Sequence, residues 1–178
     1  DRLGMSCAWR HFSVVQAAYA PAPGWQLWDA PLDDADPLGS RGLLPFLAGC
    51  AARRQGAEAA DAFRLGLLRA RHRDGRPLSR RTSLEVAEHV GLRLARFESD
   101  LEDPELRTCL AQEHHQAAAR SVVGTPTFAF EGGDLAALRV REVPRDADEA
   151  VRLFRDFRGL LARYPYLESF DRPRPPRN

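Results

Sequence analysis

The amino-acid sequence predicts an α/β fold, in which helices cover the faces of a sheet. Three features lead to this prediction: a strand-like segment near the start of the chain, a long helical block in the middle, and a hairpin followed by a helix near the end. Strands that alternate with crossover helices are typical of this class. The chain has 178 residues, 44% of them hydrophobic, which suffices for one domain with a buried core.

The strand-like segment comprises residues 6–15, SCAWRHFSVV, in which aromatic and β-branched residues favour an extended backbone. Prolines, aspartates and Gly24 follow, and they predict a long irregular loop to about residue 37. Trp25 and Trp28 in this loop fit a satellite core, and they also fit the wall of a substrate groove.

The middle of the chain repeats apolar residues at three- and four-residue spacing, which predicts a series of helices. The boundaries expected from breaks and capping residues are Gly42 to about His72 with a break at Gly56, about 80–90 with a stop at Gly91, about 94–101, and about 104–120. The last of these helices has Asp103 as its cap and Pro104 in its first position.

The last third of the chain is expected to contain a hairpin and one amphipathic helix. The alternating segments 127–131 and 135–143 predict two strands that are joined by a glycine-rich turn. A helix is expected from Asp146 to about residue 163 because apolar residues recur there on one face. The Pro/Arg-rich tail, residues 171–178, is expected to be extended.

Composition and charge exclude several classes of function. The formal net charge is +1, so neither nucleic acid nor an anionic membrane is expected as a partner. The sequence contains no apolar run of about 18 residues, the length that spans a bilayer. The three cysteines, Cys7, Cys50 and Cys109, are too far apart for a zinc site and too few for a disulfide framework. We therefore expect no metal and a cytoplasmic location.

Residues 123–128, VGTPTF, lie between the long helix and the first strand of the hairpin. Proline cannot donate to a strand ladder, so Pro126 belongs at the start of that strand. A cis Thr125–Pro126 bond is tolerated at such a place, and it would expose the backbone of Thr125 to an extended substrate. The alternative is an ordinary trans turn at the strand entry.

Several segments together resemble the DsbA-like branch of the thioredoxin superfamily. GTPTF is similar to the cis-proline loop of that branch, which implies a cis Thr125–Pro126 bond, and WRHFS at 9–13 is similar to its second strand. Residues 51–72 and 83–106 resemble its helical insertion, and YPYL at 164–167 resembles the C-terminus of bacterial members. The resemblance implies one thioredoxin-like domain over residues 1–178 with a large helical insertion over about 38–121. Cytosolic members, including the mycothiol-dependent nitroreductase group, are the most similar.

In that family the first strand leads into a helix that begins with a redox Cys motif, and this unit is absent here. The resemblance implies that the first strand and the start of the first helix are missing, with the Cys motif expected upstream of Asp1. Either such a segment precedes the chain in the natural protein, or the protein is degenerate and has repaired its sheet. We expect Cys7, Cys50 and Cys109 to be inert core residues, so no catalytic residue is assigned within the chain.

The resemblance places the candidate substrate-binding residues in two groups. Gly124, Thr125 and Pro126 form the first, as the cis-proline loop. His11 could tune a nearby thiolate or sit on a sheet face. His115 could face the active groove, although a surface or helix-packing role for it and for His114 is the alternative. Adjacent residues on a helix point in different directions, so the two histidines are not expected to share a metal.

The resemblance implies a thiol-disulfide oxidoreductase or a reductase that depends on a low-molecular-weight thiol. No tightly bound cofactor is expected, and mycothiol, bacillithiol or glutathione is the expected thiol. The partner would be a thiol or disulfide substrate, either a peptide or a small molecule, and a homodimer is allowed. Two alternatives stay open: a redox-inactive binding or chaperone-like module, and an isomerase or kappa-class glutathione transferase-like enzyme.

Overall fold

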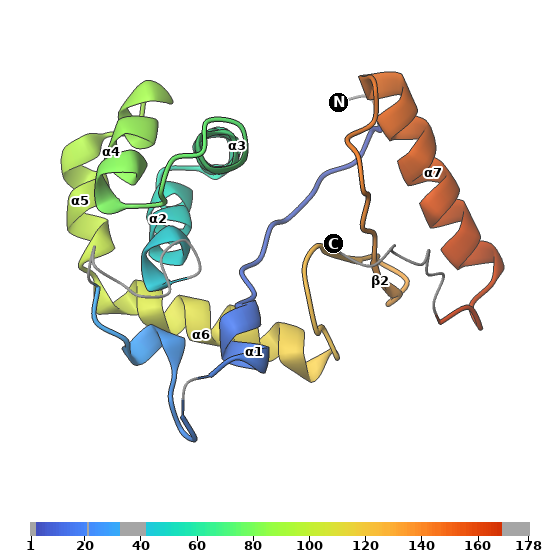
Figure 1. The fold of residues 1–178 in the computed structure, drawn as a ribbon, viewed down its shortest axis with the longest axis horizontal. Helices are drawn as coiled ribbons and strands as arrows, with labels where there is room; N and C mark the ends of the chain where they lie inside the picture. Colours follow the sequence, from blue (N-terminus) through green and yellow to red (C-terminus); the bar gives the residue numbers. More distant parts are fainter. Residues whose placement is uncertain (1–2, 21, 33–41, 169–178) are drawn as a thin grey trace, which may run out of the picture. The chain divides into compact units, whose positions relative to one another are not determined.

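The computed structural model describes residues 3–20, 22–32 and 42–168 (Figure 1). The chain divides into two compact units, each described here by itself. The helical unit comprises Trp9–Val123, and the hairpin unit comprises Asp1–Ala8 and Gly124–Asn178. The predicted helical insertion falls within the helical unit. The assignment of residues 1–178 to one domain stays a prediction, and the predicted tail at 171–178 lies outside the described residues.

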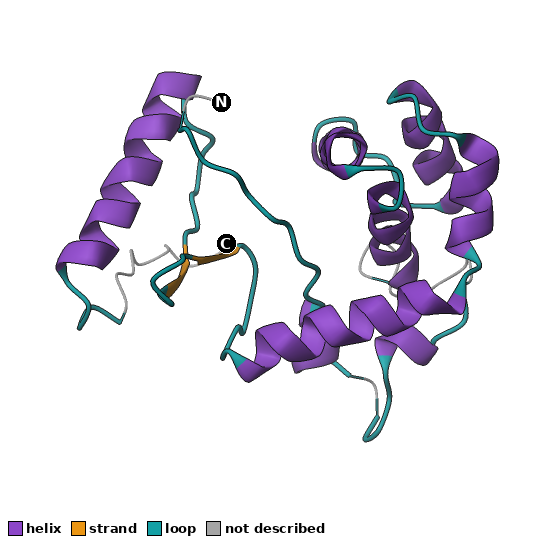
Figure 2. Ribbon diagram, turned by 180° about the vertical axis from the view of Figure 1, so that it is seen from behind, coloured by secondary structure: helices purple, strands orange, loops and turns teal. Residues whose placement is uncertain are grey.

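The helical unit confirms the helices predicted for the middle of the chain (Figure 2). The elements of this unit are α1 (Val14–Ala18), the 3₁₀ turn η1 (Leu27–Asp29), α2 (Leu43–Arg53), α3 (Ala57–His72), α4 (Arg80–His89), α5 (Leu94–Leu101) and α6 (Pro104–Ala119). The breaks fall at Gly56 and Gly91, which have φ of +119° and +78°. Only glycine adopts such angles readily. Asp103 caps α6 by accepting a hydrogen bond from the Glu105 N–H.

The core of the helical unit is built around α2, which packs against α3, α4, α5 and α6. Its apolar side chains meet those of the neighbouring helices, among them Leu47, Phe63, Phe97 and Leu110, all of them almost fully buried. Trp28 belongs to the same cluster and Trp25 packs against it. The two tryptophans therefore form part of the core, as the first of the two alternatives expected.

The strand predicted over residues 6–15 is wrong. Residues 6–13 form no strand, and α1 begins at Val14. The N–H groups of this segment bond to side chains of α6 instead of a neighbouring strand: His11 donates to Glu113 at 2.9 Å and Ser13 donates to His114 at 3.3 Å. The Ser13 hydroxyl then accepts from the Gln16 N–H and starts α1.

The hairpin unit contains β1 (Thr127–Ala129), β2 (Leu135–Ala137) and α7 (Ala147–Arg163). The two strands are antiparallel, with Thr127 opposite Ala137 and Ala129 opposite Leu135. Both are shorter than predicted, and the strand over 135–143 ends at Ala137. Pro126 precedes β1 and has no N–H to donate, so the ladder cannot extend past Thr127.

Helix α7 follows its prediction. Asp146 caps it by accepting a hydrogen bond from the Glu149 N–H at 2.8 Å, and the helix ends before Pro165. Four phenylalanines of the hairpin and the helix pack edge to face or at a tilt: Phe128, Phe130, Phe154 and Phe157. Among the described residues the fold is thus mostly helical with a small two-stranded sheet, which is compatible with the predicted α/β class. No helix in the described ranges has both the length and the apolar character to cross a membrane.

Candidate functional site

The loop formed by Gly124, Thr125 and Pro126 connects α6 to β1. Gly124 is buried, whereas Thr125 and Pro126 are exposed. The Thr125–Pro126 peptide bond, which the sequence analysis expected to be cis, is cis. The Thr127 hydroxyl donates to the Gly124 carbonyl at 2.6 Å and closes the turn. The loop therefore presents the backbone around Thr125 to solvent at the start of a strand, where an extended peptide can pair with it.

Gly124 also allows a close approach within the hairpin unit. A Cβ atom at this position would lie 3.1 Å from Nη2 of Arg139, which is tighter than ordinary van der Waals contact. The glycine thus lets the Arg139 guanidinium lie directly against the loop. A side chain at position 124 would have to displace this guanidinium.

His11 lies half-buried against α2, in the extended segment before α1. Its ring meets Phe46 edge to face at 5.8 Å between centroids. A Cβ atom at Gly49 would lie only 2.7 Å from Nε2 of His11, so the glycine leaves the room that the ring occupies. The sheet-face alternative for His11 is wrong, because this segment forms no strand.

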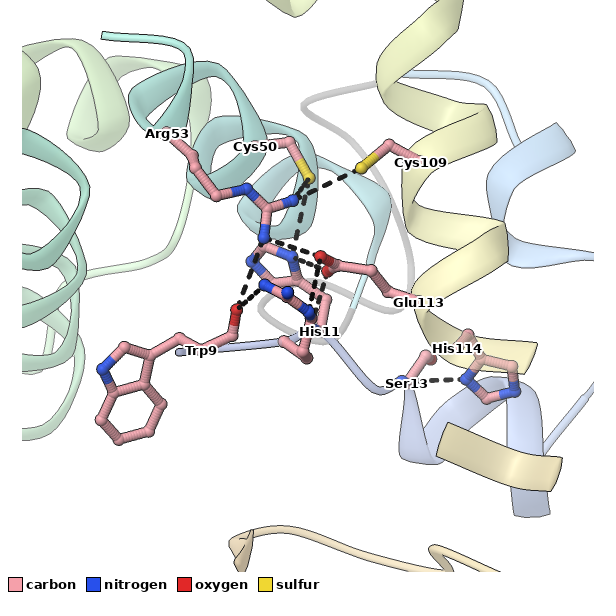
Figure 3. Close-up of polar contacts among 9 residues, drawn as sticks. Trp9, His11, Ser13, Cys50, Arg53, Cys109, Glu113 and His114 are labelled. Carbon is pink, nitrogen blue, oxygen red and sulfur yellow. Dashed lines mark hydrogen bonds and ion pairs between the residues drawn. The ribbon is translucent and has the colours of Figure 1, made fainter. Parts of the chain in front are cut away.

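Glu113 is the centre of a polar network that holds this histidine (Figure 3). Its Oε2 lies 2.9 Å from Nδ1 of His11 and accepts from the His11 N–H at the same distance. Its Oε1 accepts from Nη1 of Arg53 at 2.7 Å. Burial raises the pKa of Glu113, but the bonds from His11 and Arg53 outweigh it and lower the pKa to about 2. The carboxylate is therefore charged at neutral pH, as a buried anion with paired donors can be.

Arg53 joins this network to two cysteines. Its Nη2 lies 3.7 Å from Sγ of Cys50 and 3.4 Å from Sγ of Cys109, and both sulfurs point toward the guanidinium (Figure 3). Sγ of Cys50 also lies 3.6 Å from Nδ1 of His11. Burial is the main cause that raises the pKa of Cys50 to about 12, with the neighbouring Cys109 adding to it and Arg53 opposing it. The Cys50 thiol is thus protonated at neutral pH.

The two histidines of α6 have different environments. His114 is buried, stacks on Phe12 at 4.8 Å between centroids and accepts the Ser13 N–H through Nδ1. Burial and the charge of His115 lower the pKa of His114. His115 is exposed, and its ring meets Trp28 edge to face at 5.0 Å. The helix-packing alternative therefore describes His114, while His115 is available at the surface.

The predicted site residues thus fall into separate places. Gly124, Thr125 and Pro126 belong to the hairpin unit, whereas His11 and His115 belong to the helical unit, on different elements. His11 lies beside the thiol of Cys50, which is buried, and its predicted role beside a reactive thiolate stays a prediction.

The three cysteines were all predicted to be core residues, and they differ. Cys50 is buried, as predicted, and Cys109 is partly buried. Cys7 is exposed, so its predicted position on an apolar strand is wrong, because the strand does not form. Among the described residues no group of three or more His, Cys, Asp or Glu side chains is arranged to hold a metal ion.

The network of Arg53, Glu113 and the two thiols was missed by the sequence analysis. The residue in the sequence that could have indicated this network is Glu113, which shares a face of α6 with Leu106 and Leu110. An acidic residue at a core position requires a buried cation or several donors. The partner could not be identified, because Arg53 lies on α2, 60 residues earlier in the chain.

Comparison with protein families gives one match. The model of the DSBA-like thioredoxin domain matches residues 47–144, which is more than half of the chain. The matched range begins within α2 and includes α3 to α6, the loop of Gly124 to Pro126, and the hairpin. A search of curated proteins found no match.

Proposed function

The chain belongs to the family of DSBA-like thioredoxin domains, and from this premise we propose that the protein is a thiol-disulfide oxidoreductase or a reductase that uses a low-molecular-weight thiol. Enzymes of the thiol-disulfide type are the general rule in this family. The observation that carries the proposal is that the family match extends from α2 to the hairpin and includes the loop at Thr125 and Pro126.

The proposed substrate-binding element is the loop of Gly124, Thr125 and Pro126. Thr125 and Pro126 are exposed directly before β1, so an extended substrate can continue the backbone pairing of that strand. His115 is proposed as a further substrate contact because it is exposed on α6 and its ring orientation is fixed by Trp28. His11 is proposed as a further substrate contact on the family resemblance alone, because the sulfur near its ring in this structure is that of the buried Cys50.

The proposed reaction is thiol-disulfide exchange. A thiolate attacks one sulfur of the substrate disulfide, forms a mixed disulfide and releases the other sulfur as a thiolate; a second thiol then resolves the mixed disulfide. The attacking thiol is proposed to belong to the Cys motif that the resemblance implies upstream of Asp1. Cys50 is too deeply buried for this role.

Further parts of the proposal follow the family resemblance. The low-molecular-weight thiol would be mycothiol, bacillithiol or glutathione, with no tightly bound cofactor. The protein would act in the bacterial cytoplasm on a peptide or small-molecule disulfide, without nucleic acid or membrane partners, and as a monomer or homodimer.

The test is an assay of the full-length gene product for reduction of a small aromatic disulfide by glutathione, mycothiol or bacillithiol. We expect catalysed turnover with at least one of these thiols, and the same turnover for Cys7→Ser, since Cys7 is exposed and distant in sequence from the loop. Binding of an extended peptide without any turnover would replace the proposal with a redox-inactive binding module. Glutathione conjugation or isomerisation without disulfide turnover would replace it with the transferase or isomerase alternative.

A further inference from the structure

We propose that Cys50 and Cys109 form a redox site of their own inside the helical unit, a thiol pair that a hydroperoxide converts into a disulfide. The inference does not rest on the proposed function. It concerns two sulfurs within one unit, and neither belongs to the loop of Gly124, Thr125 and Pro126.

The inference rests on two helices that each place a cysteine sulfur beside the same guanidinium. Helices α2 and α6 pack directly against each other. Cys50 projects from α2 and Cys109 from α6, and both sulfurs contact the same nitrogen of Arg53, at 3.7 and 3.4 Å (Figure 3). Because both sulfurs contact one nitrogen atom they are near neighbours, and the two cysteines must approach each other further for a disulfide to form.

The exposure of the two thiols differs in a way that sets the order of reaction. Cys50 is 2% exposed, whereas Cys109 is only partly buried. A small oxidant from solvent therefore reaches Cys109 first. The guanidinium of Arg53 lies 3.4 Å from this sulfur, and a cation beside the sulfur is a common feature of reactive cysteines.

Arg53 is held in place for this role by the network around Glu113. Burial alone would lower the pKa of Arg53, but the hydrogen bond to Glu113 and the charge of Glu113 raise it above its usual value. The guanidinium is therefore permanently charged and fixed in direction, with Nη1 on the carboxylate and Nη2 on the sulfurs. We regard Arg53 as a positioning residue that contacts both sulfurs.

The proposed reaction has two balanced steps. The Cys109 thiolate attacks the hydroperoxide and takes one oxygen to become a sulfenic acid while the O–O bond breaks. The alkoxide, or hydroxide when the oxidant is hydrogen peroxide, takes up the proton that the Cys109 thiol gave up and leaves as an alcohol or as water. The Cys50 thiol then attacks the Cys109 sulfur; the S–S bond forms, the S–O bond breaks, and the hydroxyl leaves with the Cys50 proton as water. Two thiols lose two electrons and the hydroperoxide gains them. Two molecules of a low-molecular-weight thiol reverse the oxidation and become a disulfide.

Peptide mapping after treatment with hydrogen peroxide tests this proposal directly. The arginines place each cysteine in its own tryptic peptide: residues 3–10 for Cys7, 42–53 for Cys50 and 108–120 for Cys109. We expect a linked pair of peptides 42–53 and 108–120 that has lost two hydrogen atoms. The link should disappear on treatment with glutathione and be absent from untreated protein.

Variants separate the two steps. Cys50→Ala should stop at the sulfenic acid of Cys109, trapped by dimedone, and Cys109→Ala should leave Cys50 unmodified. Arg53→Met should slow oxidation of Cys109 by roughly tenfold, because the cation that contacts its sulfur is removed, whereas Arg81→Met, whose side chain is 88% exposed, should not change it.

The wild-type map alone can overturn the proposal. Oxidation of Cys109 to a sulfinic or sulfonic acid without any link to Cys50 would refute the pair, and so would a link that involves only Cys7. Both outcomes are independent of disulfide turnover. A failure of the thiol pair therefore leaves the proposed function standing, and a failure of turnover leaves the thiol pair standing.

Discussion

The helical unit and the hairpin unit differ in how far they bury their apolar side chains. Among the described residues, every buried apolar side chain lies between Phe12 and Leu110, within the helical unit. In the hairpin unit, by contrast, α7 contributes no buried residue, and the strands β1 and β2 are only half-buried or exposed. The aromatic cluster of the hairpin unit is thus a half-exposed face rather than a core.

The difference in burial means that the helical unit supplies most of the stability, whereas the predicted substrate-binding loop belongs to the hairpin unit. A single two-stranded hairpin packed on one helix is marginal by itself, whereas a cluster of helices with interlocked side chains supplies most of the free energy of folding. The candidate substrate loop is carried by the lightly buried unit. We expect mutations in the helical unit to change stability, and mutations in the loop to change binding.

The largest expected effect comes from the same substitution made in each unit. Leu110→Ala removes a fully buried side chain from the core and should lower the free energy of unfolding by about 3–5 kcal/mol. Leu161→Ala in α7 removes a half-buried side chain and should cost about 1 kcal/mol. Urea denaturation measures both, and equal losses would abolish the contrast between the units.

The second effect concerns the charge network of the helical unit. The folded-state pKa of Glu113 lies at about 2, below its ordinary value of 4.5. Its stabilisation is therefore complete above about pH 4.5 and is lost as the pH falls from there to about 2. Glu113→Gln should cost about 2–3 kcal/mol at pH 7 and flatten this part of the pH profile.

Glu105→Gln on the same helix is the matched control for Glu113. Its side chain is 83% exposed in its ion pair with Arg54, so the change should stay within about 0.5 kcal/mol. Thermal unfolding from pH 2 to pH 7 distinguishes the two variants. A Glu113 variant that behaves like the Glu105 variant would mean that the network contributes nothing to stability.

Replacing a helical glycine by alanine should change the free energy of unfolding by a smaller amount, and the sign of the change should differ between the two units. Gly49→Ala in α2 places a Cβ atom 2.7 Å from the His11 ring and should cost about 1–2 kcal/mol, because the ring must move. Gly159→Ala in α7 meets nothing within 4 Å and should gain about 0.5–1 kcal/mol from helix propensity. Melting temperatures that shift in the same direction would contradict the close fit of His11 against α2.

Local signals predicted the helices well, and non-local contacts explain the errors. The helix breaks at Gly56 and Gly91 and the cap at Asp103 depend on residues close in sequence, so they were predictable. The segment 6–15 has a strand-like composition, but its N–H groups bond to Glu113 and His114, about 100 residues away. No pattern within the segment indicates these partners.

In the candidate site, too, the residues that are adjacent in the sequence were predictable and those brought together by packing were not. Gly124, Thr125 and Pro126 could be identified because the motif is continuous in the sequence. The cluster of Cys50, Arg53 and Cys109 could not, because it exists only where α2 packs against α6. The exposed position of Cys7 was missed for the same reason as the strand.

The most direct test of the binding loop is the steady-state kinetics of full-length protein with two substitutions at one position. Thr125→Pro removes the backbone N–H that the substrate would pair with, whereas Thr125→Ser keeps the backbone and the hydroxyl. We predict that Thr125→Pro lowers kcat/KM for disulfide reduction by roughly tenfold, the equivalent of one lost hydrogen bond, and that Thr125→Ser stays near wild type. Wild-type kcat/KM in a folded Thr125→Pro protein, with an unchanged melting temperature, would contradict the account.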